Sequence, residues 1–259
     1  IESDFGAGFY ASNAPEDVAA NYANDAGPDL TSRIERLAER IEEDDEFDGD
    51  HGEALRRARG QLSDSAPNTM KLLMRFGNPA VLGGKGETYF DYNQEYNEDT
   101  DEYGEATGLL VDFVNALDEA SDGIDVPMRD LEKTKGKLLD AANGDGLKFA
   151  ELVQIVKVGM MDAQGEGFGE SASSEVLRQA LQEMGFDGVI DTTVSNKFGT
   201  TMVRGGETYD RAGGMKGMNK DTVHFIAFNP TQIKSATGNN GDFGGTNPDI
   251  RFSNRAQTG

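Results

Sequence analysis

The first zone of the chain, residues 1–23, has the hydrophobic pattern of a strand followed by a helix. Aromatic residues, alanine and glycine fill positions 5–11, which is typical of a buried strand that a glycine turn introduces. Ser12 or Asn13 is expected to cap the helix, because Pro15 and the two acidic residues after it favour a first turn. The apolar stripe of this helix is expected to consist of Val18, Ala19 and Tyr22.

The middle zone, residues 29–184, is expected to be mainly helical. Apolar residues recur at helical spacing in four segments, which are Leu30–Ile41, Leu110–Leu117, Met128–Ala142 and Leu177–Met184. One strand is predicted at Met70–Phe76, closed by a turn at Gly77–Pro79. The acidic run 39–50 and the polar run 93–105 are expected to be solvated surface or flexible connections, because blocks of like charge repel and extend.

The last zone, residues 185–259, has the pattern of short strands and glycine-rich loops. Strands are predicted at Phe186–Asp191 and, more strongly, at Val223–Phe228. Five glycines between residues 205 and 217 predict a mobile loop between these strands. Residues 236–259 are expected to form an irregular tail.

Composition excludes several classes of function. The 47 acidic and 24 basic residues give a net charge of −23, so binding to nucleic acid through phosphate contacts is not expected. The chain has no cysteine and two histidines, His51 and His224, which argues against a zinc site. No metal cofactor is therefore expected. No apolar run is long enough to span a membrane.

Familiar ligand motifs are incomplete. With Gly146 as the obligatory glycine of a calcium loop, Ala141 and Leu152 would occupy ligand positions, so the segment is expected to be a turn between helices. Gly83–Gly86 lacks the spacing of a phosphate-binding loop. A serine–histidine–aspartate triad built on His224 has no local support.

One ordered set of segments resembles a known family. Gly6–Ser12, then Pro15 and a helix with Tyr22, resembles the second core strand and helix of the ADP-ribosyltransferase fold, as in poly(ADP-ribose) polymerases and diphtheria-type toxins. Three later segments are similar, in the same order, to the branch of this fold found in polyvalent proteins of phages and mobile elements. They are Met70–Pro79, Leu177–Asp191, and His224–Ser235 with Asn247–Ser253.

The resemblance implies an α+β fold with a split, mainly antiparallel β core. It implies one domain over residues 1–259, with an acidic helical insertion at about 88–170 that has no family counterpart. The chain begins with Ile1, and the family's first core strand, which carries a histidine, is expected to lie upstream of it.

The resemblance also implies NAD+ as the substrate. Tyr10 would stack on the cationic nicotinamide ring, and Tyr22 would close the opposite side. Gly8, which has no Cβ, would let the ligand approach the backbone beside Phe9. Ser12 matches a family serine that supports the nicotinamide ribose. Without the rest of the pattern, Tyr10 would be interpreted as a packed strand aromatic.

The catalytic position differs from that of the family. A glutamate normally begins the last core strand, and this chain has His224 there. An imidazole can accept a hydrogen bond from the ribose but adds no negative charge. Because His224→Glu would supply that charge, it is expected to raise the rate of ADP-ribose transfer or NAD+ hydrolysis. Gln232, or Glu207 from the glycine-rich loop, is the alternative polar group; otherwise His224 only caps a strand.

These expectations favour mono-ADP-ribosylation of a host macromolecule, with a protein as the acceptor. The alternatives are an inactive member that binds NAD-like ligands or a protein partner, and an acidic virion module with a dead site. No signal peptide follows Ile1, so a location in the host cytoplasm, or delivery with the virion, is expected.

Overall fold

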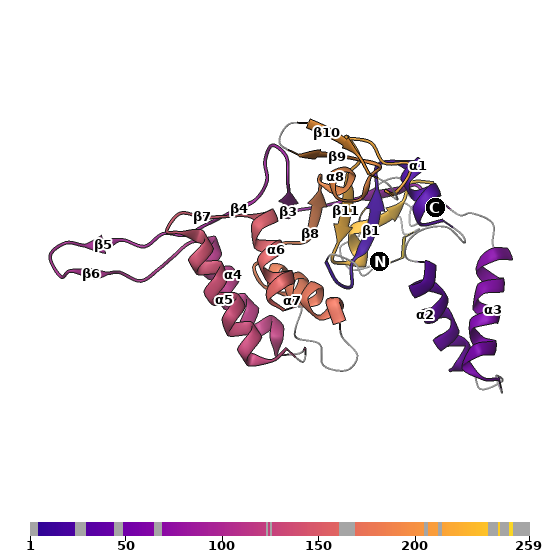
Figure 1. Ribbon diagram of the computed structural model, residues 1–259, viewed down its shortest axis with the longest axis horizontal. Coiled ribbons are helices and arrows are strands. Elements are labelled where there is room, and N and C mark those ends of the chain that lie inside the picture. Colours follow the sequence, from indigo (N-terminus) through magenta and orange to yellow (C-terminus); the bar gives the residue numbers. More distant parts are fainter. Residues whose placement is uncertain are drawn as a thin grey trace, which may run out of the picture. The chain divides into compact units, whose positions relative to one another are not determined.

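The fold was derived from a computed structural model. It describes residues 5–23, 30–43, 49–64, 69–122, 124, 126–160, 169–204, 207–211, 214–237, 243 and 249–250. Its elements are β1 (Phe9–Ser12), α1 (Pro15–Asn21), α2 (Leu30–Glu42), α3 (His51–Asp64), β2 (Leu72–Met74), β3 (Pro79–Leu82), β4 (Tyr89–Asp91), β5 (Tyr96–Asn97), β6 (Glu102–Tyr103), α4 (Leu109–Ser121), α5 (Met128–Ala142), β7 (Gly146–Lys148), α6 (Phe149–Gly159), α7 (Gly169–Glu183), β8 (Gly188–Asp191), α8 (Val194–Phe198), β9 (Thr201–Arg204), β10 (Glu207–Asp210), β11 (His224–Ala227), the 3-10 turn η1 (Pro230–Gln232) and β12 (Ile233–Ser235). Figure 1 shows them along the chain.

These elements confirm the mixed α+β class. The main sheet has the strand order β1-β11-β8-β3, and β3 runs parallel to β8 with Pro79 opposite Gly188. Four two-stranded sheets pair β10 with β9, β12 with β2, β4 with β7, and β5 with β6. All four are antiparallel. The finer assignment to an ADP-ribosyltransferase-like core stays a prediction.

The chain divides into two compact units. The larger unit contains Leu72–Thr193 with Glu2–Tyr10 and Phe225–Gly259, and the smaller contains Ala11–Lys71 with Val194–His224. The division falls within β1 and within β11. Whether the chain folds as one domain stays a prediction.

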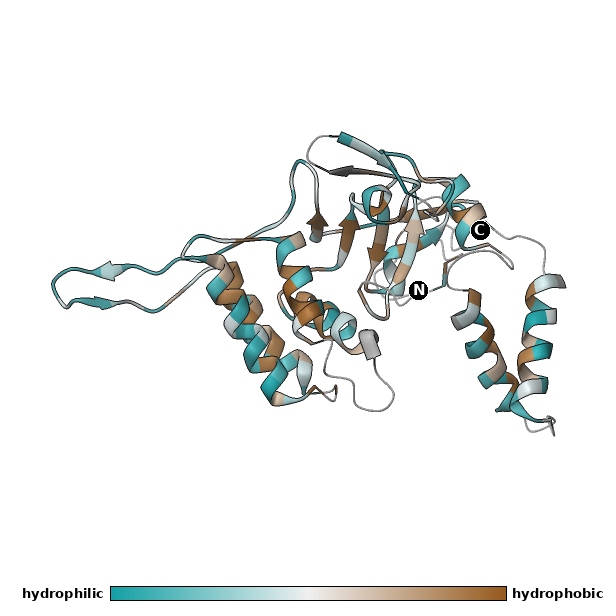
Figure 2. Cartoon of the chain, viewed as in Figure 1, coloured by the Kyte–Doolittle hydropathy of each residue, from teal (hydrophilic) through white to brown (hydrophobic). Residues whose placement is uncertain are grey.

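The larger unit has one hydrophobic core that the helices of residues 109–183 share with the sheet. Phe90 is fully buried, and its ring lies 5.6 Å from that of Phe113, 5.7 Å from that of Phe149 and 6.2 Å from that of Phe186. Leu82 of β3 and Val189 of β8 belong to the same buried cluster. Strands β3 and β8 are accordingly coloured hydrophobic in Figure 2. Phe90, Phe113 and Phe149, which lie within the segment expected as an insertion, therefore belong to this core, and whether the segment is an insertion relative to the family stays a prediction.

Two predicted features of this unit take a different form. The strand expected at Met70–Phe76 is limited to β2, and Pro79, expected to close a turn, begins a second strand, β3. The polar run 93–105 contains the β5–β6 hairpin, in which Tyr96 lies opposite Tyr103. Both rings are exposed and lie 5.0 Å apart. The hairpin is hydrophilic along most of its length (Figure 2).

The smaller unit contains α1, α2, α3, α8 and the β9–β10 hairpin. Helices α2 and α3 bury Ile34, Ala38, Ala54 and Ala58 between them. Helix α3 was not expected, because its five arginine or acidic residues and two alanines leave few large apolar residues to form a stripe. The loop expected between residues 205 and 217 contains β10, so that part of the prediction was wrong; residues 205–206 and 212–213 lie outside the described residues.

A carboxylate on α7 holds the glycine turn before β1, within the larger unit. Glu175 accepts hydrogen bonds from the backbone N–H of Ala7 at 2.9 Å and from the side chain of Gln179 at 3.0 Å. It also forms an ion pair with Arg178. The Arg178 guanidinium is the main cause that lowers the pKa of Glu175 from 4.5 to about 2, against the opposing effect of burial.

This lowered pKa predicts an acid-dependent loss of stability. A carboxylate whose folded pKa lies below its unfolded value stabilises the fold above the unfolded pKa and ceases to do so as pH falls through the folded pKa. Glu175→Gln is therefore expected to lower the free energy of unfolding by about 1–2 kcal/mol at pH 7, allowing for solvent screening. The difference from the unchanged protein should shrink between pH 4.5 and about 2. Urea unfolding at a series of pH values measures it, and a difference independent of pH would contradict the assignment.

Among the helices that the structure describes, none combines the length and the apolar character needed to cross a bilayer.

Candidate functional site

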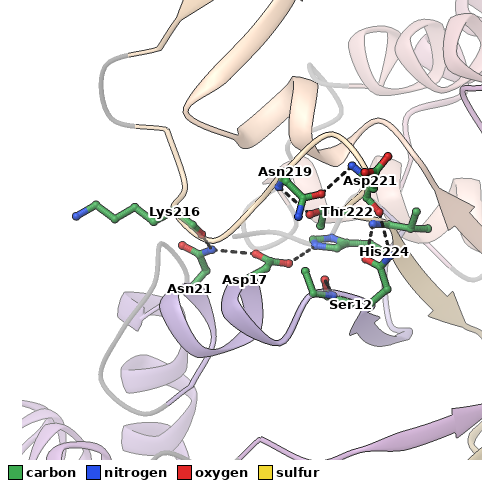
Figure 3. Close-up of polar contacts among 11 residues, drawn as sticks. Ser12, Asp17, Asn21, Lys216, Asn219, Asp221, Thr222 and His224 are labelled. Carbon is green, nitrogen blue, oxygen red and sulfur yellow. Dashed lines mark hydrogen bonds and ion pairs between the residues drawn. The ribbon is translucent and has the colours of Figure 1, made fainter.

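The candidate site lies in the smaller unit, where the first helix meets the start of β11. The Nε2 atom of His224 lies 2.8 Å from the Oδ2 atom of Asp17. The His224 side chain is 13% exposed, and the Asp17 side chain is fully buried. Figure 3 shows this pair with its polar neighbours. A buried carboxylate is therefore paired with a histidine that solvent still reaches.

Three side chains hydrogen-bond to the Asp17 carboxylate. Besides His224, the amide of Asn21 donates to Oδ1 at 2.9 Å, and the Ser12 hydroxyl is also bonded to the carboxyl group. Burial acts to raise the pKa of Asp17, but the hydrogen bonds from His224, Ser12 and Asn21 together hold it below its usual range. The carboxyl group is consequently an anion at neutral pH, and a buried negative charge lies directly behind the imidazole.

The segment before β11 is fixed against the end of β1. Asn13 donates its backbone N–H to the carbonyl of Val223 at 3.1 Å, and its side-chain oxygen accepts from the N–H of Val223 at 2.8 Å. The Asn13 amide also donates to the carbonyl of Asp221 at 2.9 Å. These three bonds align residue 13 with residues 221–223. They set the position of the backbone from which His224 projects.

The loop of residues 214–222 packs closely on α1. The Asn21 amide, already bonded to Asp17, donates to the carbonyl of Lys216 at 2.6 Å (Figure 3). Gly217 has a φ of +81°, and a Cβ there would lie 2.7 Å from the backbone nitrogen of Asp17. Only glycine satisfies both the conformation and the close approach. The loop and the buried carboxylate are thus held by the same side chain, Asn21.

Tyr22 lies beside the histidine. Its ring meets the ring of His224 edge to face, with 6.1 Å between centroids and 71° between planes. Tyr22 is the C-cap of α1, and its carbonyl accepts a hydrogen bond from Arg33 of α2 at 2.8 Å. The sequence prediction that Tyr22 flanks a site is compatible with this position, but a contact with NAD+ stays a prediction.

The helix was predicted with the wrong buried face. Its expected stripe, Val18, Ala19 and Tyr22, is intermediate or exposed, whereas Asp17 and Asn21 are the buried residues of α1. Ser12 and Asn13 are not the N-cap; that residue is Ala14, whose N–H donates to the Ser12 hydroxyl at 3.2 Å. The helix therefore buries a polar face, which an apolar-stripe argument does not detect.

The residues expected on the first strand belong to the larger unit. Phe9 is 47% exposed and Tyr10 is 43% exposed, so the expectation of a buried strand was wrong; β1 lies at an edge of the main sheet. The Tyr10 hydroxyl donates to the carbonyl of Gly6 at 3.2 Å and accepts from the N–H of Phe5 at 3.2 Å. A Cβ at Gly8 would lie 2.7 Å from Cγ2 of Ile226. Packing against β11 thus accounts for this glycine, and a ligand role stays a prediction.

The two alternative catalytic residues have other partners. In the larger unit, the Gln232 side chain accepts from the N–H of Asn229 at 2.9 Å and donates to the carbonyl of Arg75 at 3.2 Å, which fixes the turn η1. In the smaller unit, Glu207 lies on β10 and accepts from the Tyr209 hydroxyl at 2.7 Å. Their catalytic roles are untested, and the contacts favour structural ones.

The described residues contain no group of three or more histidine, aspartate or glutamate side chains arranged to hold a metal ion. The site that they do form can accept or donate a proton at the imidazole, and it can stabilise positive charge through Asp17.

Asp17 and Asn21 are the site residues that the sequence argument missed. Asp17 looked like one of the acidic residues common in a first helical turn, and such residues are normally exposed. The spacing of four residues between Asp17 and Asn21 places them on one helix face, but it gives no sign that the face is buried.

Comparison with family models, with curated protein sequences and with solved structures gives no match for this chain.

Proposed function

We propose that this protein binds NAD+ and transfers its ADP-ribose group to a macromolecular acceptor, with His224 at the reacting centre. The observation that carries the proposal is the pairing of His224 with the buried Asp17 carboxylate beside the Tyr22 ring. The ordered sequence resemblance, from Gly6–Ser12 to His224–Ser235, supplies the identity of the substrate.

The chemistry fits what the three side chains offer. When the bond between C1′ of the ribose and the nicotinamide nitrogen breaks, its electron pair neutralises the nicotinamide ring and the ribose develops positive charge. An anion close to that ribose stabilises the developing charge. The sequence argument left this anion missing, since His224 replaces the family glutamate. The Asp17 carboxylate, 2.8 Å from the imidazole, supports the proposal by supplying negative charge from behind.

The remaining steps of the transfer need a hydrogen bond and a proton acceptor. The imidazole of His224 would accept a hydrogen bond from a ribose hydroxyl, or take the proton that the acceptor nucleophile loses as it bonds to C1′. The Tyr22 ring would lie along the planar, cationic nicotinamide, which aromatic faces attract. The strand order supports the arrangement further, because β1 neighbours β11, the strand that begins with His224.

Release of nicotinamide from NAD+ tests the proposal directly. The protein is expected to release nicotinamide from NAD+, and to label a protein acceptor when one is present. Binding of NAD+ without any release would favour the alternative of a binding module. Absence of both would overturn the proposal.

Tyr22 offers a test of the binding step. Tyr22→Leu is expected to weaken NAD+ binding by about 1–2 kcal/mol, because leucine keeps apolar volume but loses the aromatic face. Isothermal titration calorimetry measures the change. Tyr209→Leu is the matched control, since Tyr209 is an exposed tyrosine of the same unit whose hydroxyl bonds to Glu207. Equal affinities of the two variants would remove Tyr22 from the site.

A further inference from the structure

We infer that Asp17 is a positioning residue that fixes the tautomer of His224, so that Nε2 carries the proton and Nδ1 is the ring nitrogen offered to the substrate. This inference rests on the proposed function for the identity of the substrate. The assignment of the tautomer stands on the contact between Asp17 and His224, on the burial of Asp17 and on its ionised state.

The first step is the direction of the hydrogen bond between the two side chains. Asp17 is ionised and fully buried, so its carboxylate can only accept hydrogen bonds. Its Oδ2 atom lies 2.8 Å from Nε2 of His224. The proton in this contact must therefore be on Nε2. In a neutral imidazole the other nitrogen, Nδ1, then carries a lone pair.

The second step concerns Nδ1. Among the residues that the structure describes, Nδ1 has no hydrogen-bond partner, while the side chain as a whole is 13% exposed. The ring cannot turn freely to exchange its nitrogens, because the buried carboxylate would lose the hydrogen bond from Nε2. Nδ1 thus remains the atom able to accept a hydrogen bond or a proton from a bound molecule.

The third step explains why an asparagine side chain cannot make the same hydrogen bonds as the Asp17 carboxylate. Asp17 receives hydrogen bonds on both oxygens, from Asn21 on Oδ1 and from His224 on Oδ2. In Asp17→Asn, one side of the new amide presents its NH2 group to one of these partners. If that partner is His224, Nε2 must become the acceptor and the proton moves to Nδ1. If it is Asn21, two NH2 groups face each other, which is unfavourable.

The chain allows this to be read by nuclear magnetic resonance, because it has only two histidines. In protein labelled with 15N at histidine, long-range proton–nitrogen spectra at a pH above the titration of the rings distinguish the two tautomers. His51 is the internal reference, since its ring contacts Glu42 and Glu35 and not Asp17. A His51→Gln variant assigns its signals.

The expected result is an Nε2–H tautomer of His224 in the unchanged protein. In Asp17→Asn we expect a shift toward Nδ1–H or a mixture, with the His51 signals unmoved. Asp221→Asn is the matched control, because it removes an exposed carboxylate three residues before His224. An Nδ1–H tautomer in the unchanged protein overturns the inference, even if Asp17→Asn fails to fold. An unaltered tautomer in folded Asp17→Asn overturns it as well.

Kinetics then connect the tautomer with the proposed reaction. Asp17→Asn is expected to lower kcat for nicotinamide release by about 10–100-fold, with KM for NAD+ changed much less, because the loss concerns orientation at the reacting atoms. A change confined to KM would contradict the positioning role. If the unchanged protein releases no nicotinamide, the proposed function fails while the tautomer result still decides the role of Asp17.

Discussion

Replacing His224 with alanine is expected to lower the rate of nicotinamide release by about tenfold to a hundredfold, the effect of one lost charge-assisted hydrogen bond at the reacting centre. The Asp17 carboxylate would remain, but its hydrogen bond from Nε2 would be lost. Steady-state assays of NAD+ consumption measure the change. His51→Ala is the matched control, because His51 lies exposed at the start of α3 and pairs with Glu35 and Glu42. Equal rates in the two variants would remove His224 from the reaction.

A glutamate at position 224 tests the role of the Asp17 charge in nicotinamide release. From sequence alone, His224→Glu is expected to raise the rate of nicotinamide release, because it places an anion where the resemblance implies a catalytic glutamate. The contact between residues 17 and 224 predicts a different result, since the new carboxylate would meet the buried Asp17 carboxylate. Two such groups share one proton, so the pair would carry about the same charge as Asp17 does alone. His224→Glu is therefore expected to be no faster than the unchanged protein.

A double variant tests whether the charge of Asp17 limits the activity of His224→Glu. In Asp17→Asn with His224→Glu, the like-charge contact is removed and a single carboxylate stands where the resemblance implies a catalytic glutamate. This variant is expected to be about tenfold or more faster than His224→Glu alone. If the single variant were the faster of the two, the Asp17 charge would not act on this position.

The sequence predicted the elements whose side chains are large and apolar. Strand β11 was expected within Val223–Phe228, because β-branched and aromatic residues follow one another there. Helices α4 and α5 were expected from apolar residues at helical spacing. In α4 the residues that define the pattern also fill the core, and in α5 Leu131, Leu138 and Ala142 do so. Met128 and Leu139 of α5 are exposed, so the local pattern and the final burial agree only in part there.

The elements that were missed bury residues with weak signals. Helix α3 packs through the small residues Ala54 and Ala58, whose hydrophobicity adds little to an apolar stripe. Strand β3 begins at Pro79, which was interpreted as the end of a strand. Proline is nevertheless tolerated at the first position of a strand. Its pairing with β8 is a contact between residues more than a hundred positions apart, which a local pattern does not encode.

The candidate site was predicted only in part, because part of it depends on contacts between residues far apart in the sequence. His224 was singled out in the sequence because the resemblance implies a catalytic residue at the start of its strand. Asp17 was not, because it becomes buried only when the loop of residues 214–222 and the start of β11 meet α1. The pairing of an acid at position 17 with a histidine at position 224 is a product of tertiary structure. The tyrosine at position 22 was expected near the site, and it lies beside this histidine.

The aromatic core of the larger unit leads to the largest stability effect that we expect. Phe90 lies on β4, within the segment that was expected to be an insertion, and it contacts the rings of Phe113, Phe149 and Phe186. Phe186 precedes β8 of the main sheet, so the contact joins the segment to the sheet. Phe90→Ala is expected to lower the free energy of unfolding by about 3–5 kcal/mol, because a fully buried ring is lost and a cavity remains.

Urea unfolding followed by circular dichroism measures this loss. Tyr103→Ala is the matched control in the same segment, because the Tyr103 side chain is 67% exposed on the β5–β6 hairpin. Exposed positions of this kind usually change stability by less than about 0.5 kcal/mol. Hydrogen exchange is a second measurement. If the core is shared, Phe90→Ala should reduce the protection of backbone amides in β8 as well as in α4 and α6. Protection lost in α4 and α6 alone would contradict a core that these helices share with the sheet.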